Sequence, residues 1–183
     1  MEPAETLAGE TVSLRRWRAT DGAALHRAIN ESLDHLGAFL PWAVDSYSES
    51  DAGEFLRRTD RQWRSGDRFE YAITGTGAEI VGGCGLMTRI GGRGLEIGYW
   101  LAKSATGRGL VTQAARLLID EALRIGATRV EIHHDEANQR SGAVPRRLGF
   151  TRAGTRAASL GGGTASTGTL VVWRMLPGEW GSR

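Results

Sequence analysis

The sequence is poor in cysteine and lacks long apolar runs, and each shortage excludes a class of protein. With Cys84 as its only cysteine, the chain cannot form an internal disulfide or a CxxC metal site. No apolar stretch approaches the ~20 residues of a membrane-spanning helix. The acidic start, MEPAETLAGE, also lacks the apolar core of a signal peptide. We therefore expect a cytoplasmic protein with no membrane partner.

Lysine is scarce as well, since Lys103 is the only one and the other cationic side chains are arginines. The formal net charge is only +2, so a large basic surface, and with it a nucleic-acid partner, is not expected. The 183 residues with 40% hydrophobic content suit one globular domain spanning residues 1–183.

The hydrophobic pattern predicts a mixed order of strands and helices, because alternation marks strands and a 3.6-residue period marks helices. Strands are predicted at 11–18, 68–75, 79–90, 94–102, 128–134, 150–156 and 169–176, and helices at 20–29, 50–63, 109–125 and after residue 138. This order predicts an α+β (α/β three-layer) domain, with about seven strands in a mixed sheet flanked by about four helices.

The most informative stretch is LAKSATGRGLVTQAARLL, residues 101–118, in which the turn Gly107-Arg108-Gly109 joins a strand to a helix. The free amides and the dipole of a helix N-terminus favour an anion. A plain tight turn explains the glycines equally well. The dinucleotide fingerprint needs a third glycine where Thr112 stands, and no Gly-Lys-Ser/Thr of a P-loop is present.

Asn138 and Ser141 lie three residues apart at the start of a short helix. The structural interpretation of Asn138 is an N-cap, and Ser141 can be ordinary helix surface. The functional interpretation places the Ser141 hydroxyl where it can donate a proton to a leaving group.

Three further features have both structural and functional interpretations. Glu96 in the strand GLEIGYW is an ion-pair partner or, if partly desolvated, a base. The run His133–Glu136 lacks helical metal-ligand spacing, so no metal site is expected. Trp42, which follows Pro41 in a loop, is the best aromatic candidate for lining a substrate pocket.

The order of these motifs resembles the GNAT superfamily of acyl-CoA-dependent N-acyltransferases. The resemblance rests on EIGYWLAKSATGRGLVTQAARLLIDEAL followed by a strand and ANQRSGAVPRRLGF. The start LRRWRATDGAALHRAINES…LPW and the run N-x-x-S-x-x-V-x-x-x-L-G-F are similar to the RimJ/RimL-like branch, the ribosomal-protein N-terminal acetyltransferases. The resemblance covers about residues 7–177.

The resemblance implies acetyl-CoA as the cosubstrate and no metal. It implies that the strand before the glycine turn, the turn itself and the two helix starts bind the cofactor: Tyr99, Trp100, Leu101, Thr106, Gly107, Arg108, Gly109, Leu110, Val111, Thr112, Asn138 and Ser141. The family motif Gln/Arg-x-x-Gly-x-Gly/Ala matches residues 106–111, where Gly109 fits while Thr106 and Val111 depart from it. Ser141 and Glu96 are the implied catalytic acid and base.

The implied reaction is direct attack of a primary amine on the thioester in a ternary complex. The acceptor is a protein N-terminal α-amine or a small amine such as an antibiotic or metabolite, and a succinyl or other acyl donor stays open. A non-catalytic acyl-CoA sensor is the alternative from another class. The family also makes a homodimer an expectation.

Overall fold

The computed structural model describes residues 2–159 and 161–181. Its helices are α1 (Gly22–Asn30), α2 (Leu33–Leu36), α3 (Glu49–Ser65), α4 (Leu110–Arg124) and α5 (Gln139–Arg147). Its strands are β1 (Thr6–Ala8), β2 (Ser13–Arg16), β3 (Arg68–Thr74), β4 (Ile80–Met87), β5 (Gly94–Leu101), β6 (Arg129–Asp135), β7 (Thr151–Ala157) and β8 (Thr169–Met175). Short 3-10 helices lie at Ala19–Asp21, Pro41–Ala43, Lys103–Ala105 and Pro177–Glu179.

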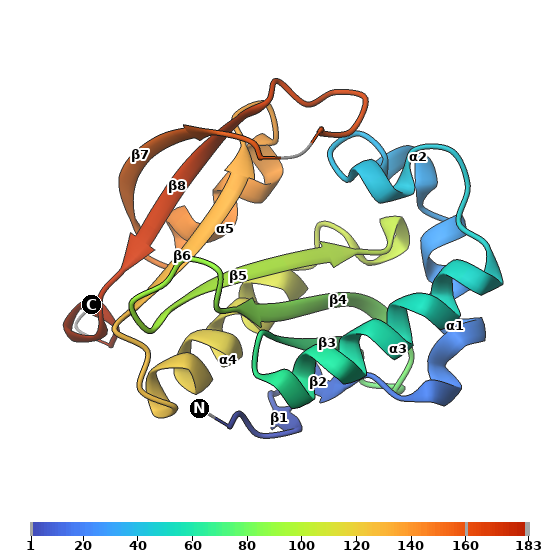
Figure 1. Cartoon of the computed structure of the whole chain (residues 1–183), viewed down its shortest axis with the longest axis horizontal. Helices are drawn as coiled ribbons and strands as arrows, with labels where there is room; N and C mark the ends of the chain where they lie inside the picture. The colour runs from blue at the N-terminus through green and yellow to red at the C-terminus, as the bar shows by residue number, and fades with distance from the viewer. Residues whose placement is uncertain (1, 160, 182–183) are drawn as a thin grey trace.

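The strands form a single sheet in the order β1-β2-β3-β4-β5-β6-β8-β7 (Figure 1). Its neighbouring strands pair antiparallel except β5 and β6, which are parallel and joined through α4. The predicted mixed, mostly antiparallel sheet is therefore confirmed, with one strand more than expected because the pattern missed β1.

The parallel pair comes apart halfway along its length. β5 and β6 pair from Gly94 opposite Arg129 to Ile97 opposite Ile132, and no further. Beyond that point β5 still pairs with β4, and β6 still pairs with β8. We call the gap between residues 98–101 of β5 and 133–135 of β6 the splay. Each strand has a neighbour on its outer side only, so backbone groups on the inner edges are left facing the gap.

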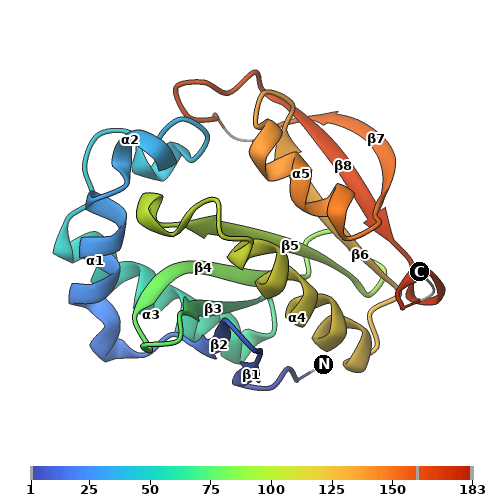
Figure 2. The same ribbon diagram turned by 180° about the vertical axis from the view of Figure 1, so that it is seen from behind.

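Helices cover the two faces of the sheet unequally. α4 and α5 lie on one face, which we call the back face (Figure 2). The main apolar core lies there and includes Leu95 and Ile97 of β5 with Leu118 of α4. α1 and α3 lie on the front face over β2–β4, with a smaller core that includes Leu25 and Leu56 (Figure 1). The front face of β5, β6 and β8 carries no helix.

A loop from the C-terminal hairpin closes one end of the splay. The backbone amides of Thr164 and Ala165 donate to the carbonyls of Gly37 and Ala38, just after α2, at 2.9 and 2.8 Å. The Gly/Ser/Thr-rich loop between β7 and β8 is thus docked on the N-terminal half of the chain, although Leu160 lies outside the described residues.

The carboxylate of Asp135, at the end of β6, fixes the other side of that loop. It accepts hydrogen bonds from the Ser166 hydroxyl and from the amides of Thr167 and Gly168, the latter two at 2.9 and 3.2 Å. It also accepts one from the amide of Ala137 at 3.0 Å, one residue before the α5 cap. Burial alone would raise the pKa of Asp135, but these hydrogen bonds outweigh it and lower the pKa.

Two helix boundaries differ from the sequence prediction. α3 begins one residue earlier than residue 50, because Ser48 and Asp51 form a reciprocal capping box around its first turn. Asp21 does not cap α1 with its side chain. Its carboxylate instead accepts from Arg15 at 2.7 and 2.9 Å and from the amide of Arg18 at 2.8 Å. α2 was not predicted, since a four-residue helix has too little periodicity to show in a sequence.

Within the described ranges, none of the helices is both long and apolar enough to cross a bilayer.

Candidate active site

The N-terminus of α4 opens at the wide end of the splay without a side-chain cap. Its N-cap position is Gly109, with φ 75° and no side-chain hydrogen bond. α3 and α5, by contrast, are capped by Ser48 and Asn138. The first-turn amides of α4 thus keep the positive end of the helix dipole available for an anion.

The loop before α4 is built to expose its backbone. Gly107 also has a positive φ of 78°, and a Cβ at either glycine would meet nothing within 4 Å. Thr106 donates its hydroxyl to the Lys103 carbonyl at 2.9 Å and so stabilises the turn internally. Arg108 is exposed. The Lys103 ammonium is ion-paired with Asp34, which leaves Arg108 as the cation of this loop that can meet a ligand.

Across the splay, Asn138 caps α5 as its structural interpretation predicted. Its side-chain oxygen accepts from the Ser141 amide at 3.1 Å. Gly142 lets the helix approach β6, because a Cβ there would lie 2.6 Å from the ring of His134. That ring accepts from the Trp173 indole N–H at 2.9 Å and so ties β6 to β8 beneath the helix.

A proline explains why the Ser141 backbone is available for a partner. Pro145 lies inside α5 and has no N–H, so the carbonyl four residues earlier, that of Ser141, lacks its usual helical donor. The Tyr99 hydroxyl reaches across from β5 and donates to that carbonyl at 3.0 Å. The Ser141 hydroxyl in turn donates to the Tyr99 oxygen at 3.2 Å. Two predicted site residues from β5 and α5 are thus joined on the back face.

The Tyr99 phenol is held neutral. Burial raises the pKa of Tyr99 to about 12, although the hydrogen bond from Ser141 works in the opposite direction. The pair is therefore neutral and hydrogen-bonded beside the splay.

The front face at the same position is highly charged. The Glu96 side chain is only 3% exposed and forms a bidentate ion pair with Arg89. The Arg89 Nε donates to Oε2 at 2.8 Å, and its Nη2 donates to Oε1. This ion pair raises the pKa of Arg89. The ion-pair interpretation of Glu96 is thus observed, while its role as a base stays a prediction.

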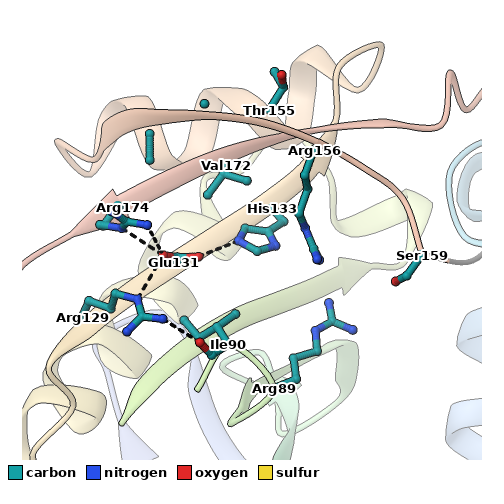
Figure 3. Close-up of a pocket in the computed structure, with 12 residues that line it drawn as sticks. Arg89, Ile90, Arg129, Glu131, His133, Thr155, Arg156, Ser159, Val172 and Arg174 are labelled. Carbon is teal, nitrogen blue, oxygen red and sulfur yellow. Dashed lines mark hydrogen bonds and ion pairs between the residues drawn. The ribbon is translucent and has the colours of Figure 1, made fainter. Parts of the chain in front are cut away.

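Two residues of β6 extend this charged group into a cluster with Glu96. His133 follows the last residue paired with β5, and its side chain is 4% exposed. Its Nε2 lies 2.9 Å from Oε2 of Glu131, and its Nδ1 lies 3.3 Å from Oε2 of Glu96. Arg129 and Arg174 also donate to Glu131, at 3.2 and 2.9 Å (Figure 3).

The pKa values follow from this surplus of donors. Burial would raise the pKa of Glu131, but hydrogen bonds from one histidine and two arginines outweigh it and lower the pKa. A cavity of about 570 Å³ lies over the cluster, lined among others by Arg89, Glu131, His133 and Arg156 (Figure 3). The front face thus offers a polar cavity beside the end of the splay.

The comparisons with known proteins agree with this geometry. A model of the acetyltransferase (GNAT) domain matches residues 11–151.

The chain belongs to the GNAT acetyltransferase family.

Several similar proteins and solved structures match nearly the whole chain. YdaF of Bacillus subtilis (strain 168), named as a candidate ribosomal N-acetyltransferase, is 29% identical over 93% of this chain and 94% of its own. RimL, a ribosomal L7/L12 α-N-protein acetyltransferase solved with coenzyme A, superposes with a TM-score of 0.84 at 23% identity, covering 94% of this chain and 98% of its own. MccE, a microcin C7 self-immunity acetyltransferase solved with acetyl-CoA and AMP, has a TM-score of 0.84 at 20% identity, covering 92% and 93%.

As a GNAT N-acetyltransferase, the protein brings most of its predicted site residues to the splay. Tyr99, Trp100 and Leu101 form its β5 edge. The predicted loop and first-turn residues lie at its wide end: Thr106, Gly107, Arg108, Gly109, Leu110, Val111 and Thr112. Asn138 and Ser141 lie on α5. Which of them contact ligand stays a prediction.

Trp42 lies apart from the cavity over Glu131, on the front side of the enzyme. Its ring is 44% exposed and makes edge contacts with Trp100 and Tyr47, with centroids 6.2 and 6.0 Å away. Through Trp100 it is linked to β5, so an aromatic wall borders the splay on this side.

The sequence interpretation of this GNAT acetyltransferase missed the charged cluster. The run His133–Glu136 had been considered only as a metal site, which was not expected. The signal that could have found the charged cluster was period two, because Arg129, Glu131 and His133 alternate along β6 and so share one face.

Proposed function

We propose that this enzyme transfers the acetyl group of acetyl-CoA to a primary amine by direct attack in a ternary complex. The observation that carries the proposal is the splay, which opens a parallel strand pair toward the uncapped α4 N-terminus. A gap with one free backbone edge and an anion-binding end suits the pantetheine arm and pyrophosphate of coenzyme A.

The cofactor-binding residues divide the ligand between them. The inner backbone edge of Tyr99, Trp100 and Leu101 pairs with the amide groups of the pantetheine arm. The loop 106–109 and the first-turn amides of Leu110, Val111 and Thr112 receive the pyrophosphate, with Arg108 adding positive charge. The structures of RimL with coenzyme A and MccE with acetyl-CoA support this cosubstrate.

The chemistry follows from the two faces. A neutral amine on the front face attacks the thioester carbonyl, and a strand amide at the end of the splay stabilises the oxyanion. The thiolate leaves on the back face, where Ser141 donates a proton and Tyr99 supports it. Glu96 serves as base on the opposite side.

The acceptor we infer is the N-terminal α-amine of a protein, as the name of RimL describes for that protein. YdaF is likewise named for a ribosomal acceptor. The front cavity is open and polar enough for a chain end, and an α-amine with a pKa near ~8 needs only a modest base. A small amine is the second candidate, supported by the MccE similarity. Trp42 lies apart from this cavity, so its contact with the acceptor stays a prediction. A homodimer also stays a prediction.

The test is an acceptor screen. Ribosomal-protein N-terminal peptides and small amines are incubated with acetyl-CoA, and products are detected by a mass increase of one acetyl group. We expect the peptides to be acetylated on the α-amine. Stabilisation by coenzyme A without acetylation of any acceptor would indicate a sensor, and a melting temperature unmoved by coenzyme A would contradict the whole proposal.

A further inference from the structure

The base assigned to this reaction is poorly placed to act alone. Glu96 is 3% exposed and accepts hydrogen bonds from Nε and Nη2 of Arg89. The bidentate guanidinium thus occupies both carboxylate oxygens, which limits the access of an incoming proton. A second group must therefore be found to receive the proton.

His133 is that second group by its position. It directly follows Ile132, which pairs with Ile97 at the end of the parallel ladder. Its side chain points to the front face, beside the cavity and opposite to the side of Ser141 (Figure 3). If the proposed function holds, the thioester lies at this end of the splay, and His133 lies next to it on the acceptor side.

The hydrogen-bond pattern shows which nitrogen is available. A carboxylate only accepts, so the 2.9 Å contact with Glu131 requires that Nε2 carry hydrogen and donate it. Nδ1 is buried and has no hydrogen-bond partner among the described residues. It lies 3.3 Å from Oε2 of Glu96. A proton placed between these two atoms would satisfy both, and a buried polar atom without a partner is costly.

We propose that Glu96 and His133 act as one proton-accepting pair for the acceptor amine, with Glu131 as the residue that positions the imidazole. This inference rests on the proposed function. The ammonium of the acceptor gives a proton to Glu96, directly or through one water, and the proton is shared with Nδ1. The neutral amine then attacks the thioester carbonyl carbon. As the C–S bond breaks, Ser141 gives its proton to the thiolate and takes up the second proton of the amine, and the imidazolium later releases the first proton to solvent.

The charges around the pair set how readily it accepts the proton. The groups that face it come from the β4–β5 loop and from strands β5, β6, β7 and β8: Arg89, Glu96, Arg129, Glu131, Arg156 and Arg174. The positive charges of the four arginines oppose the binding of a further proton in the cluster, and so favour its release to solvent in each cycle.

The test is the pH profile of kcat for His133→Gln, with an N-terminal peptide as acceptor. Glutamine can keep the donor toward Glu131 while it removes Nδ1. We expect kcat about 100-fold below wild type near pH 7, within the usual range for loss of an acid–base group. The deficit should shrink to a few-fold at about pH 9.5, because an α-amine with a pKa near ~8 then deprotonates itself. Acetyl-CoA affinity should be unchanged.

Further variants separate this role from a structural one. His26→Gln on α1 makes the same exchange outside the cluster and should match wild type. Glu96→Gln should show the same pH shape, and the double variant should lose no more than the worse single variant, because the two residues act as a unit. Glu131→Gln should give a smaller deficit of the same shape, which covers the case in which His133→Gln does not fold.

Three outcomes would overturn the inference. The first is a pH profile of kcat for His133→Gln that equals that of wild type, and the second is a loss of kcat of the same size at every pH. The third is a double variant whose loss of kcat equals the product of the two single losses. Wild type that acetylates peptides under those conditions would retain the proposed function. Wild type that acetylates no amine would overturn both.

Discussion

At the end of the splay the two faces of the sheet carry opposite chemistry. On the back face, Tyr99 and Ser141 form a neutral hydroxyl pair, in which burial raises the pKa of Tyr99 to about 12. On the front face, Glu96, His133 and Glu131 form a charged, buried chain. Glu96 and Tyr99 thus point to opposite sides of the same strand, because successive side chains of a strand alternate between its two faces.

The separation matches what the proposed reaction needs. The leaving thiolate requires a donor that stays protonated, and the attacking amine requires an acceptor. Placed on one face, the two groups would neutralise each other through a direct proton transfer. The sheet lies between the two groups and separates them. The thioester would fill the splay, which is the gap through which the two faces meet.

Removing the back-face donor should have the largest effect on turnover. Ser141→Ala is expected to lower kcat about 100-fold while the KM for acetyl-CoA stays near wild type, because the hydroxyl acts on the leaving group. Steady-state kinetics with varied acetyl-CoA measure this, with Ser65→Ala on α3 as control. A raised KM with normal kcat would assign Ser141 to binding instead.

Charging the α4 N-terminus should next weaken the cofactor binding on which both faces depend. Gly109→Asp places a carboxylate beside the proposed pyrophosphate site and should weaken coenzyme A binding about 30-fold, or about 2 kcal/mol. A residue other than glycine is strained at a φ of 75°, so the variant should also lose some stability, as its control does. The matched control is Gly66→Asp, because Gly66 lies at the C-cap of α3, away from the splay, and has a similar φ of 77°. Calorimetric titration showing equal affinity for both variants would contradict the site.

Tyr99→Phe should have a smaller effect than Ser141→Ala, about 10-fold in kcat. The serine hydroxyl remains, but it loses its hydrogen-bond partner on β5. If the loss exceeds that of Ser141→Ala, Tyr99 is the direct donor and the order of the two hydroxyls is reversed.

Pro145→Ala should lower kcat only a few-fold, through its effect on the hydrogen bonds of the back face. The new amide can donate to the Ser141 carbonyl and compete with Tyr99 for it. We expect a more stable protein by about 1 kcal/mol, since proline disfavours helix interiors, together with a lower kcat. Denaturant unfolding and kinetics on the same samples test this, and a variant that gains both stability and activity would refute the linkage.

The smallest expected effect is a pH dependence of stability that comes from His134, the residue of β6 on which α5 packs. Burial lowers the pKa of His134, although its hydrogen bond to the Asp135 carbonyl works the other way. Below about pH 6.5 the unfolded chain therefore binds a proton that the folded state refuses, and stability falls as pH decreases. The free energy of unfolding should drop by up to about 1 kcal/mol between about pH 7 and pH 5. His134→Gln should show a shallower slope, and an equal slope would assign the dependence to other groups.

The order of elements could be predicted from the sequence because it depends on local periodicity, and the same alternation determines which side chains of β5 share a face. Leu95, Ile97 and Tyr99 do face the back core, and Trp100 packs in the front one, as alternation required. The glycine turn before α4 was also predictable, since only glycine readily takes the positive φ found there.

What could not be predicted depends on contacts between distant residues. No pattern shows that β5 and β6 stop pairing after Ile97, and that point decides where His133 lies. No pattern shows either that Tyr99, 46 positions before Pro145 in the chain, donates to the carbonyl that this proline leaves without its helical donor. The capture of Glu96 by Arg89 likewise depends on the conformation of a loop.

The most direct test of the separation of the two faces is a crystal structure with a bisubstrate analogue, in which coenzyme A is linked to a peptide N-terminus through an acetyl bridge. We expect the pantetheine to lie between β5 and β6, with the sulfur on the side of Ser141 and the peptide nitrogen on the side of Glu96 and His133. A sulfur and nitrogen on the same face of the sheet, or coenzyme A bound outside the splay, would contradict it.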